Sequence, residues 1–228
     1  MSPTAAQRIG LPEGTTLDDV PVRGATGRWW RQTSPRYGAL DLLDRARQGG
    51  RCHRKYEPSP CYTSSTETTA WAELFRHVYG EVSPFEMRRR MSEIEVTHLP
   101  VVDFEDPDVR DMFSVSERSL VSNNYAACRK LADLLRQRPD RFGGMILPSA
   151  AVPGERTLVV FRDRVPDHLT VVKEEVGTTP TRLLPLFRRV AETLPKPLRS
   201  VAKFFIRQLE RELSDRARKK LLRPLHPA

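Results

Sequence analysis

The stretch CYTSSTETTAWAELFRH, residues 61–77, decides the fold. It predicts a short strand that ends at Tyr62, a turn rich in Ser and Thr, and a helix that carries Glu73. One of the four turn residues at 63–66 is expected to cap this helix, because each side chain can accept a backbone N–H. Glu67 falls in the first turn, where the helix dipole favours a carboxylate and no functional reason is needed.

Glu73 lies deeper in the same helix, with Trp71 and Ala72 before it and Leu74 and Phe75 after it. A carboxylate among apolar neighbours is either paired with a partner or used in a functional site. The local sequence leaves both interpretations open.

Length and composition exclude several classes of protein. The 228 residues suffice for one domain with a substantial core and an appendage. There is no apolar run of about 18 residues and no secretory signal at the N-terminus, so we expect a cytoplasmic protein. Three cysteines, Cys52, Cys61 and Cys128, form no even disulfide framework. Because Cys52, His53 and Cys61 match no zinc-ligand spacing, no metal is expected.

The net charge of +9 belongs to the C-terminal part of the chain. From Gly177 onward there are 13 Lys and Arg against 4 Asp and Glu, and the preceding residues carry 25 of each sign. The body therefore gives no electrostatic indication of nucleic-acid binding.

The tail contains a predicted amphipathic helix at about 197–222. Its apolar residues recur every three or four positions, and its opposite face is basic. The helix either docks on the body or binds an anionic partner. That partner could be another macromolecule or a membrane surface, and the sequence leaves both possibilities open. We expect a loose lead-in at 1–26, a body at 27–176 and this Pro-interrupted tail at 177–228.

The predicted fold class is α+β, with mixed, mostly antiparallel short strands and flanking helices. IEVTHLPVVDFED, residues 94–106, predicts two strands with a break at Pro100, and the preceding charged segment at 84–90 is expected to be solvated. Segments 106–113 and 115–139 predict helices, the second with an apolar stripe that should belong to the core. Residues 145–147, 157–161 and 168–176 predict further strands.

Two polar residues lie where strands are expected to end. Trp29 and Trp30 predict a strand that fixes Arg31, whose planar guanidinium could bind a phosphate or carboxylate; a structural salt bridge is the alternative. Ser149 follows the buried strand at 145–147, a common position for a ligand contact, although such a serine is often only a turn residue. Without a G-x-S-x-G motif it is not a nucleophile elbow.

Four segments taken in order resemble the RES domain family. They are WRQTSPRYG (30–38), GRCHR (50–54), CYTSSTETTAWAE (61–73) and GGMILPSAAVPGERTLVVF (143–161). The family is named for an Arg, a Glu and a Ser, matched here by Arg31, Glu73 and Ser149, and Tyr62 matches a tyrosine on the strand before the Glu helix. One departure is Cys52, where many relatives carry an aromatic residue after the arginine.

The resemblance, which runs from about residue 27 to 172, implies a toxin of a bacterial toxin–antitoxin pair with an ADP-ribosyltransferase-like fold. Such proteins cleave the nicotinamide–ribose bond of NAD and transfer ADP-ribose to water, phosphate or a protein. NAD is then a substrate, with no other cofactor, and the implied partner is an Xre-type helix-turn-helix antitoxin.

The resemblance also suggests a role for each matched residue. Glu73 would stabilise the ribose cation that forms as nicotinamide leaves. Arg31 would bind the pyrophosphate or a ribose, Tyr62 would pack against the nicotinamide, and Ser149 would orient the ribose or Glu73. Arg51 is a second candidate for a phosphate contact. The alternative function is a catalytically degenerate RES-like protein that binds nucleic acid or a protein through its basic tail.

Overall fold

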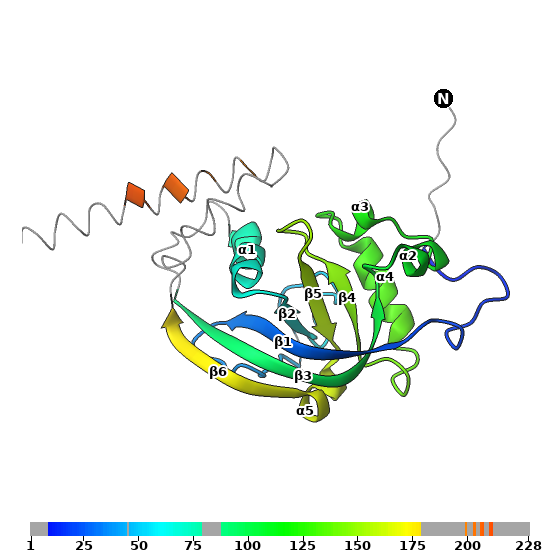
Figure 1. The fold of residues 1–228 in the computed structure, drawn as a ribbon, viewed down its shortest axis with the longest axis horizontal. Helices are drawn as coiled ribbons and strands as arrows, with labels where there is room; N and C mark the ends of the chain where they lie inside the picture. The colour runs from blue at the N-terminus through cyan, green and yellow to red at the C-terminus, as the bar shows by residue number, and fades with distance from the viewer. Residues whose placement is uncertain are drawn as a thin grey trace, which may run out of the picture.

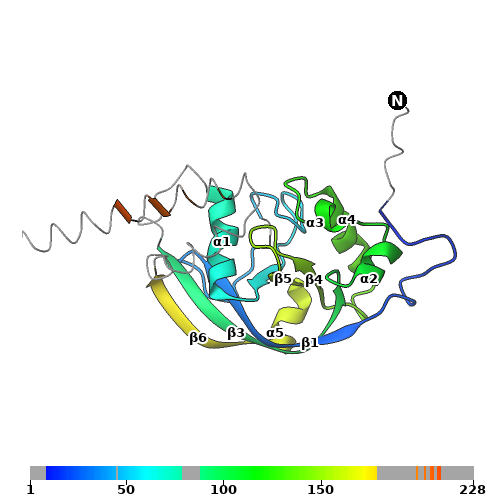
Figure 2. The ribbon, with the colours of Figure 1, turned by 45° about the horizontal axis from the view of Figure 1, so that its top comes forward.

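The computed structural model describes residues 9–44, 46–78 and 88–178, together with the six helical positions 199, 203, 206, 207, 210 and 211. Figure 1 shows a strongly curved sheet with α1 over one end and α2, α3 and α4 over the other, and the tilted view in Figure 2 shows the same separation. The elements are β1 (Arg23–Thr33), β2 (Cys61–Ser64), α1 (Glu67–Val78), β3 (Arg89–Asp103), α2 (Pro107–Met112), α3 (Glu117–Leu120), α4 (Ala126–Leu135), β4 (Gly144–Pro148), β5 (Arg156–Val160), the 3-10 helix η1 (Arg162–Arg164), α5 (Val165–His168) and β6 (Leu169–Thr178).

The strands β1, β2, β5, β4 and β3 form a closed ring, because β3 pairs back with β1. The β3–β4 pair is parallel and the other pairs are antiparallel, with β6 added beside β3. The prediction of a mixed, mostly antiparallel α+β fold is confirmed. The finer likeness to ADP-ribosyltransferases stays a prediction.

The ring closes through a single residue pair between β1 and β2, Trp30 with Ser64. Continuing that antiparallel register would pair residues 31–33 of β1 with residues 61–63 of β2, but these two described stretches do not pair. The strands therefore part here, and we call the gap between 31–33 and 61–63 the seam of the ring.

The predicted break at Pro100 is wrong, because β3 runs without interruption from Arg89 to Asp103. Residues 89–96 of β3 pair with β6 and residues 101–103 pair with β4, so Pro100 lies between the two ladders, where its carbonyl accepts the Gly143 N–H at 2.7 Å. A missing N–H there removes no ladder hydrogen bond. The end of the segment expected to be solvated also belongs to the sheet, with Arg89 and Arg90 half-buried in β3.

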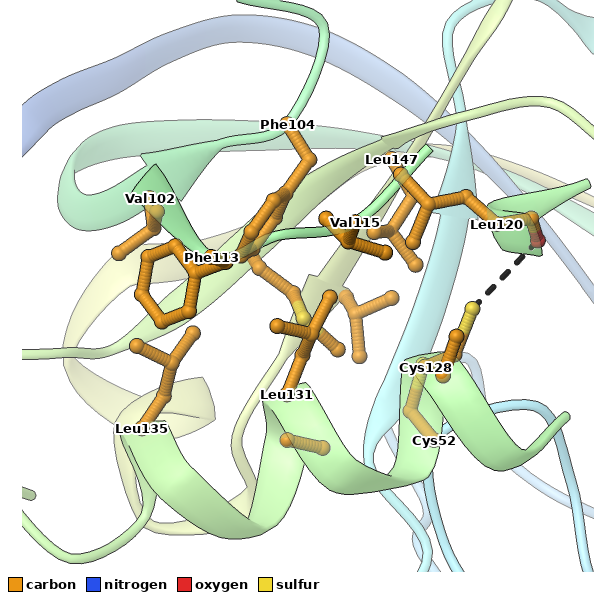
Figure 3. Packing of buried hydrophobic residues seen from close by; sticks show 14 of the residues in the cluster. Cys52, Val102, Phe104, Phe113, Val115, Leu120, Cys128, Leu131, Leu135 and Leu147 are labelled. Atoms are coloured by element: carbon orange, nitrogen blue, oxygen red, sulfur yellow. Dashed lines mark hydrogen bonds between the residues drawn. The ribbon is translucent and has the colours of Figure 1, made fainter. Parts of the chain in front are cut away.

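The core against α4 confirms the predicted apolar stripe. Cys128, Leu131 and Leu135 are fully buried on one face of α4, and Figure 3 shows them beneath the side chains of the β3–β4 region. The rings of Phe104 and Phe113 pack edge to face at 5.2 Å between centroids. Such a pair adds to the stability that burial of the rings provides.

The boundary between the predicted N-terminal lead-in and the body differs from the expected one. β1 begins at Arg23, so the last residues of the predicted lead-in at 1–26 belong to the sheet. Before it, Val20 is fully buried in the α4 core, and its carbonyl accepts a hydrogen bond from Arg141. The predicted helix at about 197–222 lies outside the described residues apart from the six positions named above. No helix in the described ranges combines the length and apolarity that crossing a membrane requires.

Shortening Leu131 tests the importance of the α4 core. We expect Leu131→Ala to lower the free energy of unfolding by about 2–5 kcal/mol, because it removes a fully buried side chain and leaves a cavity. Lys130→Ala on the exposed side of the same helix should change it by no more than about 0.5 kcal/mol. Urea denaturation of the two variants gives both values, and equal effects would contradict this assignment of the core.

Candidate active site

Helix α1 is fixed at its start and along its inner face. The Thr66 hydroxyl caps the helix by accepting the N–H of Thr69 at 3.1 Å, as expected for one of the residues 63–66. Trp71 and Phe75 are buried and their rings stack at 6.1 Å. These contacts place Glu73 on a face of the helix that Trp71 and Phe75 do not share, with a defined height along the axis.

The carboxylate of Glu73 is held through one of its two oxygens. Oε1 accepts hydrogen bonds from the Ser149 hydroxyl at 2.7 Å and from the backbone N–H groups of Ala150 at 2.9 Å and Ala151 at 3.3 Å. Among the described residues, no hydrogen bond reaches Oε2. The carboxylate therefore has a fixed orientation and keeps one oxygen available to a ligand.

Ser149 is saturated by its own turn and by Glu73. Its buried hydroxyl donates to Glu73 and accepts from the N–H groups of Ala151 at 3.2 Å and Val152 at 3.1 Å. A hydroxyl has one proton and two lone pairs, and all are engaged here. Ser149 is therefore a positioning residue for the carboxylate in this arrangement.

The turn that carries Ser149 is also tied to the segment before α1. The Ser65 hydroxyl bonds to the Glu155 carboxylate at 2.5 Å, and the Ser65 N–H donates to the carbonyl of Arg156 at 3.0 Å. These bonds join the end of β2 to the start of β5. The distance between Glu73 and Ser149 is thus fixed by backbone and side-chain contacts at both ends.

A cleft of about 240 Å³, which we call the Glu73 cleft, lies beside this carboxylate. Arg31, Arg51, Tyr62 and Glu73 line it together, and Ser149 lies behind Glu73. All five candidate residues predicted from the sequence are therefore gathered at one place, although they come from four separate parts of the chain. Their individual roles stay predictions.

Arg31 lies on the seam between β1 and β2. Its guanidinium donates to the sulfur of Cys61 across the gap and to the backbone carbonyl of Asp41 at 3.0 Å. The alternative of a structural salt bridge is not seen, because no described carboxylate pairs with Arg31. Its charge remains available to an anion.

Arg51 is a buried cation with unused donors. Its Nη2 donates to the carbonyls of Leu120 and Pro148, both at 2.8 Å, while Nε and Nη1 have no partner in the described structure. The residue is only 7% exposed. Leaving charged N–H groups buried and unpaired is costly, so an anion in the cleft would offset a penalty that already exists.

Tyr62 presents its ring to the cleft while its hydroxyl is held elsewhere. The hydroxyl accepts the Cys52 N–H at 2.8 Å and lies 3.0 Å from Nδ1 of His53, to which it can donate its proton. Burial raises the pKa of Tyr62 well above its usual value. A Cβ at Gly50 would lie 2.4 Å from the His53 ring, so this arrangement requires a residue without a side chain there.

Sequence reasoning missed several residues of the cleft. Arg76 and His77 line it from α1, and Gln32 lines it from β1. His77 could have been found from its position four residues after Glu73, which places both on one face of a helix. Gln32 gives no such signal, because it faces the cleft only where β1 and β2 part. Within the described residues no group of three or more metal-ligating side chains is clustered.

Comparisons with known proteins agree on one family. Residues 25–186 match the model of the RES domain. A protein of Mycobacterium tuberculosis H37Rv named "Probable NAD(+) phosphorylase Rv3189" is 39% identical over 173 residues, which cover 74% of this chain and 82% of that protein.

A solved structure shares the fold. A chain of the crystal structure of the M. tuberculosis MbcT–MbcA toxin–antitoxin complex aligns with a TM-score of 0.60 and 19% identity, covering 74% of this chain and 91% of that one. At this identity the likeness concerns the fold alone.

The Tyr62–His53 contact predicts a pH dependence of stability. Burial and, next, the positive charge of Arg136 lower the pKa of His53 below its ordinary 6.5. The unfolded chain therefore binds a proton at His53 before the folded chain does, and stability should fall as pH decreases below about 6.5. The His53→Gln variant keeps a hydrogen-bond acceptor for Tyr62 but has no group that titrates at position 53. Between pH 7 and 5 the free energy of unfolding of this variant should therefore decline less than that of the unmodified protein.

Urea denaturation at several pH values measures this difference, and an NMR titration reads His53 directly. A His53 resonance that titrates at or above pH 6.5 would contradict the burial argument.

Proposed function

The chain belongs to the RES domain family, and on this premise we propose that it is an NAD-consuming toxin of a bacterial toxin–antitoxin pair. The observation that carries the proposal is the Glu73 carboxylate, with Oε1 bound by three donors and Oε2 open to a cleft lined by three arginines that have no carboxylate partner in the described structure. A cleft of this kind suits a substrate that is anionic at one end and develops positive charge at the reacting carbon.

Cleavage of the nicotinamide–ribose bond needs stabilisation of a sugar cation. The bond's electron pair goes to the nicotinamide nitrogen, which leaves as a neutral base, so no general acid is required. We propose that Oε2 of Glu73 accepts a hydrogen bond from the ribose 2′-hydroxyl and faces the developing charge. Ser149 and the two backbone N–H groups keep this oxygen in place, which spares reorganisation during the reaction.

Tyr62 and Arg31 would orient the two sides of the reacting nucleotide. The Tyr62 ring lines the cleft, and with its hydroxyl held by Cys52 and His53 it offers a rigid face for the nicotinamide. Arg31, at the seam, would bind the pyrophosphate through its planar fork. The sheet around the cleft would then be of the ADP-ribosyltransferase type.

We propose inorganic phosphate as the acceptor. The relative named as a probable NAD(+) phosphorylase motivates this choice, and Arg51 supplies two buried donor nitrogens, Nε and Nη1, for an anion near Glu73. A phosphate oxygen would form a bond to the ribose C1′ as the bond to nicotinamide breaks, giving ADP-ribose 1″-phosphate. Arg51 would reduce the repulsion between the phosphate and the Glu73 carboxylate.

The likeness to a chain of a toxin–antitoxin complex motivates the proposal of an antitoxin partner. We propose an Xre-type helix-turn-helix protein, and rescue of growth by co-expressing such a protein from a neighbouring gene tests it. The alternative of a degenerate body that acts through its tail is less well supported, since the proposed site is fully assembled.

Replacing the central carboxylate tests the proposed reaction. We expect Glu73→Gln to reduce nicotinamide release from NAD by at least about 100-fold, because the amide cannot stabilise positive charge. Glu67→Gln, in the first turn of the same helix and outside the cleft, is the matched control and should retain activity within a few fold. Chromatography of released nicotinamide gives the rate for each variant. Equal rates for the two variants would show that Glu73 takes no part in the reaction.

The identity of the acceptor is tested by the products. With phosphate present, mass spectrometry should detect ADP-ribose 1″-phosphate, and the rate should rise with phosphate concentration until the site is saturated. The Arg51→Lys variant keeps the positive charge but loses the planar guanidinium that can bind phosphate through two N–H groups. It should therefore raise the phosphate concentration needed for half-maximal rate by about tenfold. Free ADP-ribose as the main product at every phosphate concentration would show that water is the acceptor.

A further inference from the structure

The Glu73 cleft is too small for a whole dinucleotide. Its volume is about 240 Å³, whereas sites that enclose drug-sized ligands span roughly 300–1,000 Å³. It can take the nicotinamide riboside half of NAD. The remaining half must occupy another part of the surface that is continuous with this cleft.

A second cavity of about 480 Å³ adjoins the cleft on the other side of the seam. We call it the Tyr37 cavity; it is formed by the end of β1 and by the loop from residue 34 to residue 60. Arg31, Gln32 and Tyr62 line both hollows, so one ligand can extend from one to the other past these side chains. The parting of β1 and β2 creates this passage.

The charged side chains that line the Tyr37 cavity are mainly positive, and these form no ion pairs in the described structure. Arg31, Arg47 and Arg89 line it against one carboxylate, Asp41, which accepts the Gly38 N–H at 2.6 Å. No carboxylate of the described residues pairs with any of the three arginines. This balance favours a ligand with two negative charges, such as a pyrophosphate.

Arg89 is the clearest of these cations. Its Nε donates to the side-chain oxygen of Gln32 at 2.7 Å, and the described structure gives Nη1 and Nη2 no partner. Burial lowers the pKa of Arg89 because it removes part of the charge from water, and no described carboxylate compensates for this. An anion between Arg89 and Arg31 would supply that compensation.

The outer wall of the cavity offers apolar surface that can receive a base. Tyr37 is 46% exposed and Leu43 is 45% exposed, and both line the cavity. A flat heterocycle can stack on a tyrosine ring and cover a leucine, and such stacking contributes about 1–3 kcal/mol per base.

We propose that the Tyr37 cavity binds the adenosine diphosphate half of the substrate, with the pyrophosphate between Arg31 and Arg89 and the adenine on Tyr37 and Leu43. The proposal rests on NAD being the substrate of the Glu73 cleft. It makes Arg89 and Tyr37 determinants of specificity for a dinucleotide over nicotinamide mononucleotide.

A groove elsewhere on the protein is a weaker candidate for the adenosine diphosphate half. A groove of about 680 Å³ lies beside Phe161, and it shares no lining residue with the Glu73 cleft. Its arginines, Arg136 and Arg162, are paired with Asp133 and Asp44. This groove is not continuous with the Glu73 cleft and these two arginines are neutralised by carboxylates, so nothing favours the binding of a nucleotide there.

Calorimetric titration with ADP tests the proposal without any chemistry. The full-length Glu73→Gln variant should bind ADP, and ADP should compete with NAD. Adding Arg89→Gln should weaken ADP binding by at least about tenfold, and adding Tyr37→Ala should weaken it while leaving the affinity for inorganic pyrophosphate nearly the same. Tyr37 is exposed, so its replacement keeps the test valid if Arg89→Gln fails to fold.

Arg28→Gln is the matched control. Arg28 lies on β1 with its side chain 46% exposed and pairs with Glu93 and Glu95, outside both hollows. In the active protein, Arg89→Gln should raise the KM for NAD by about tenfold, more than it lowers kcat, whereas Arg28→Gln should do neither.

The outcomes separate this proposal from the proposed reaction. ADP that fails to bind, that binds without competing with NAD, or that binds equally well to the Arg89 and Tyr37 variants would overturn the assignment of the cavity. ADP binding that depends on Arg89 and Tyr37 in a protein that releases no nicotinamide would retain the cavity and overturn only the cleavage reaction.

Discussion

The pairing of Trp30 with Ser64 is the constraint on which the site depends. This one pair closes the ring of strands, and the next three residues of β1 have no partner on β2. If the pairing continued, a regular ladder would fill the space where Arg31 and Tyr62 now line the Glu73 cleft and the Tyr37 cavity. The polar lining of the seam is tolerated because its cations retain access to water or to a ligand.

The contact between Glu73 and Ser149 fixes the part of the site that carries the carboxylate. It joins a helix and a turn that are 76 residues apart in the chain, and the bonds of Ser65 to Glu155 and Arg156 fix the same two segments a second time. Because the carboxylate is bound by a hydroxyl and two backbone donors, its position does not depend on a flexible cation. Such preorganisation is what stabilisation of a transient positive charge requires.

Local patterns predicted the elements of this site better than they predicted its boundaries. A cap among residues 63–66, the helix with Glu73 and the strand before Ser149 all follow from residue types at short range. The uninterrupted β3 does not, because a proline at position 100 is acceptable only where the neighbouring strands leave an edge free, which is a property of the whole sheet. The same limit applies to Arg89: a run of three arginines indicates a solvated segment unless the closed ring of strands is already known.

Electrostatics shows why composition gave no sign of a site for an anion. The first 176 residues carry equal numbers of acidic and basic side chains, yet the pairing is uneven. Surface arginines such as Arg54 and Arg138 are matched by carboxylates, whereas Arg31, Arg51 and Arg89 around the seam have none in the described structure. A neutral body can therefore hold a strongly positive cleft, because the field at the site depends on which charges are close and poorly screened and not on their sum.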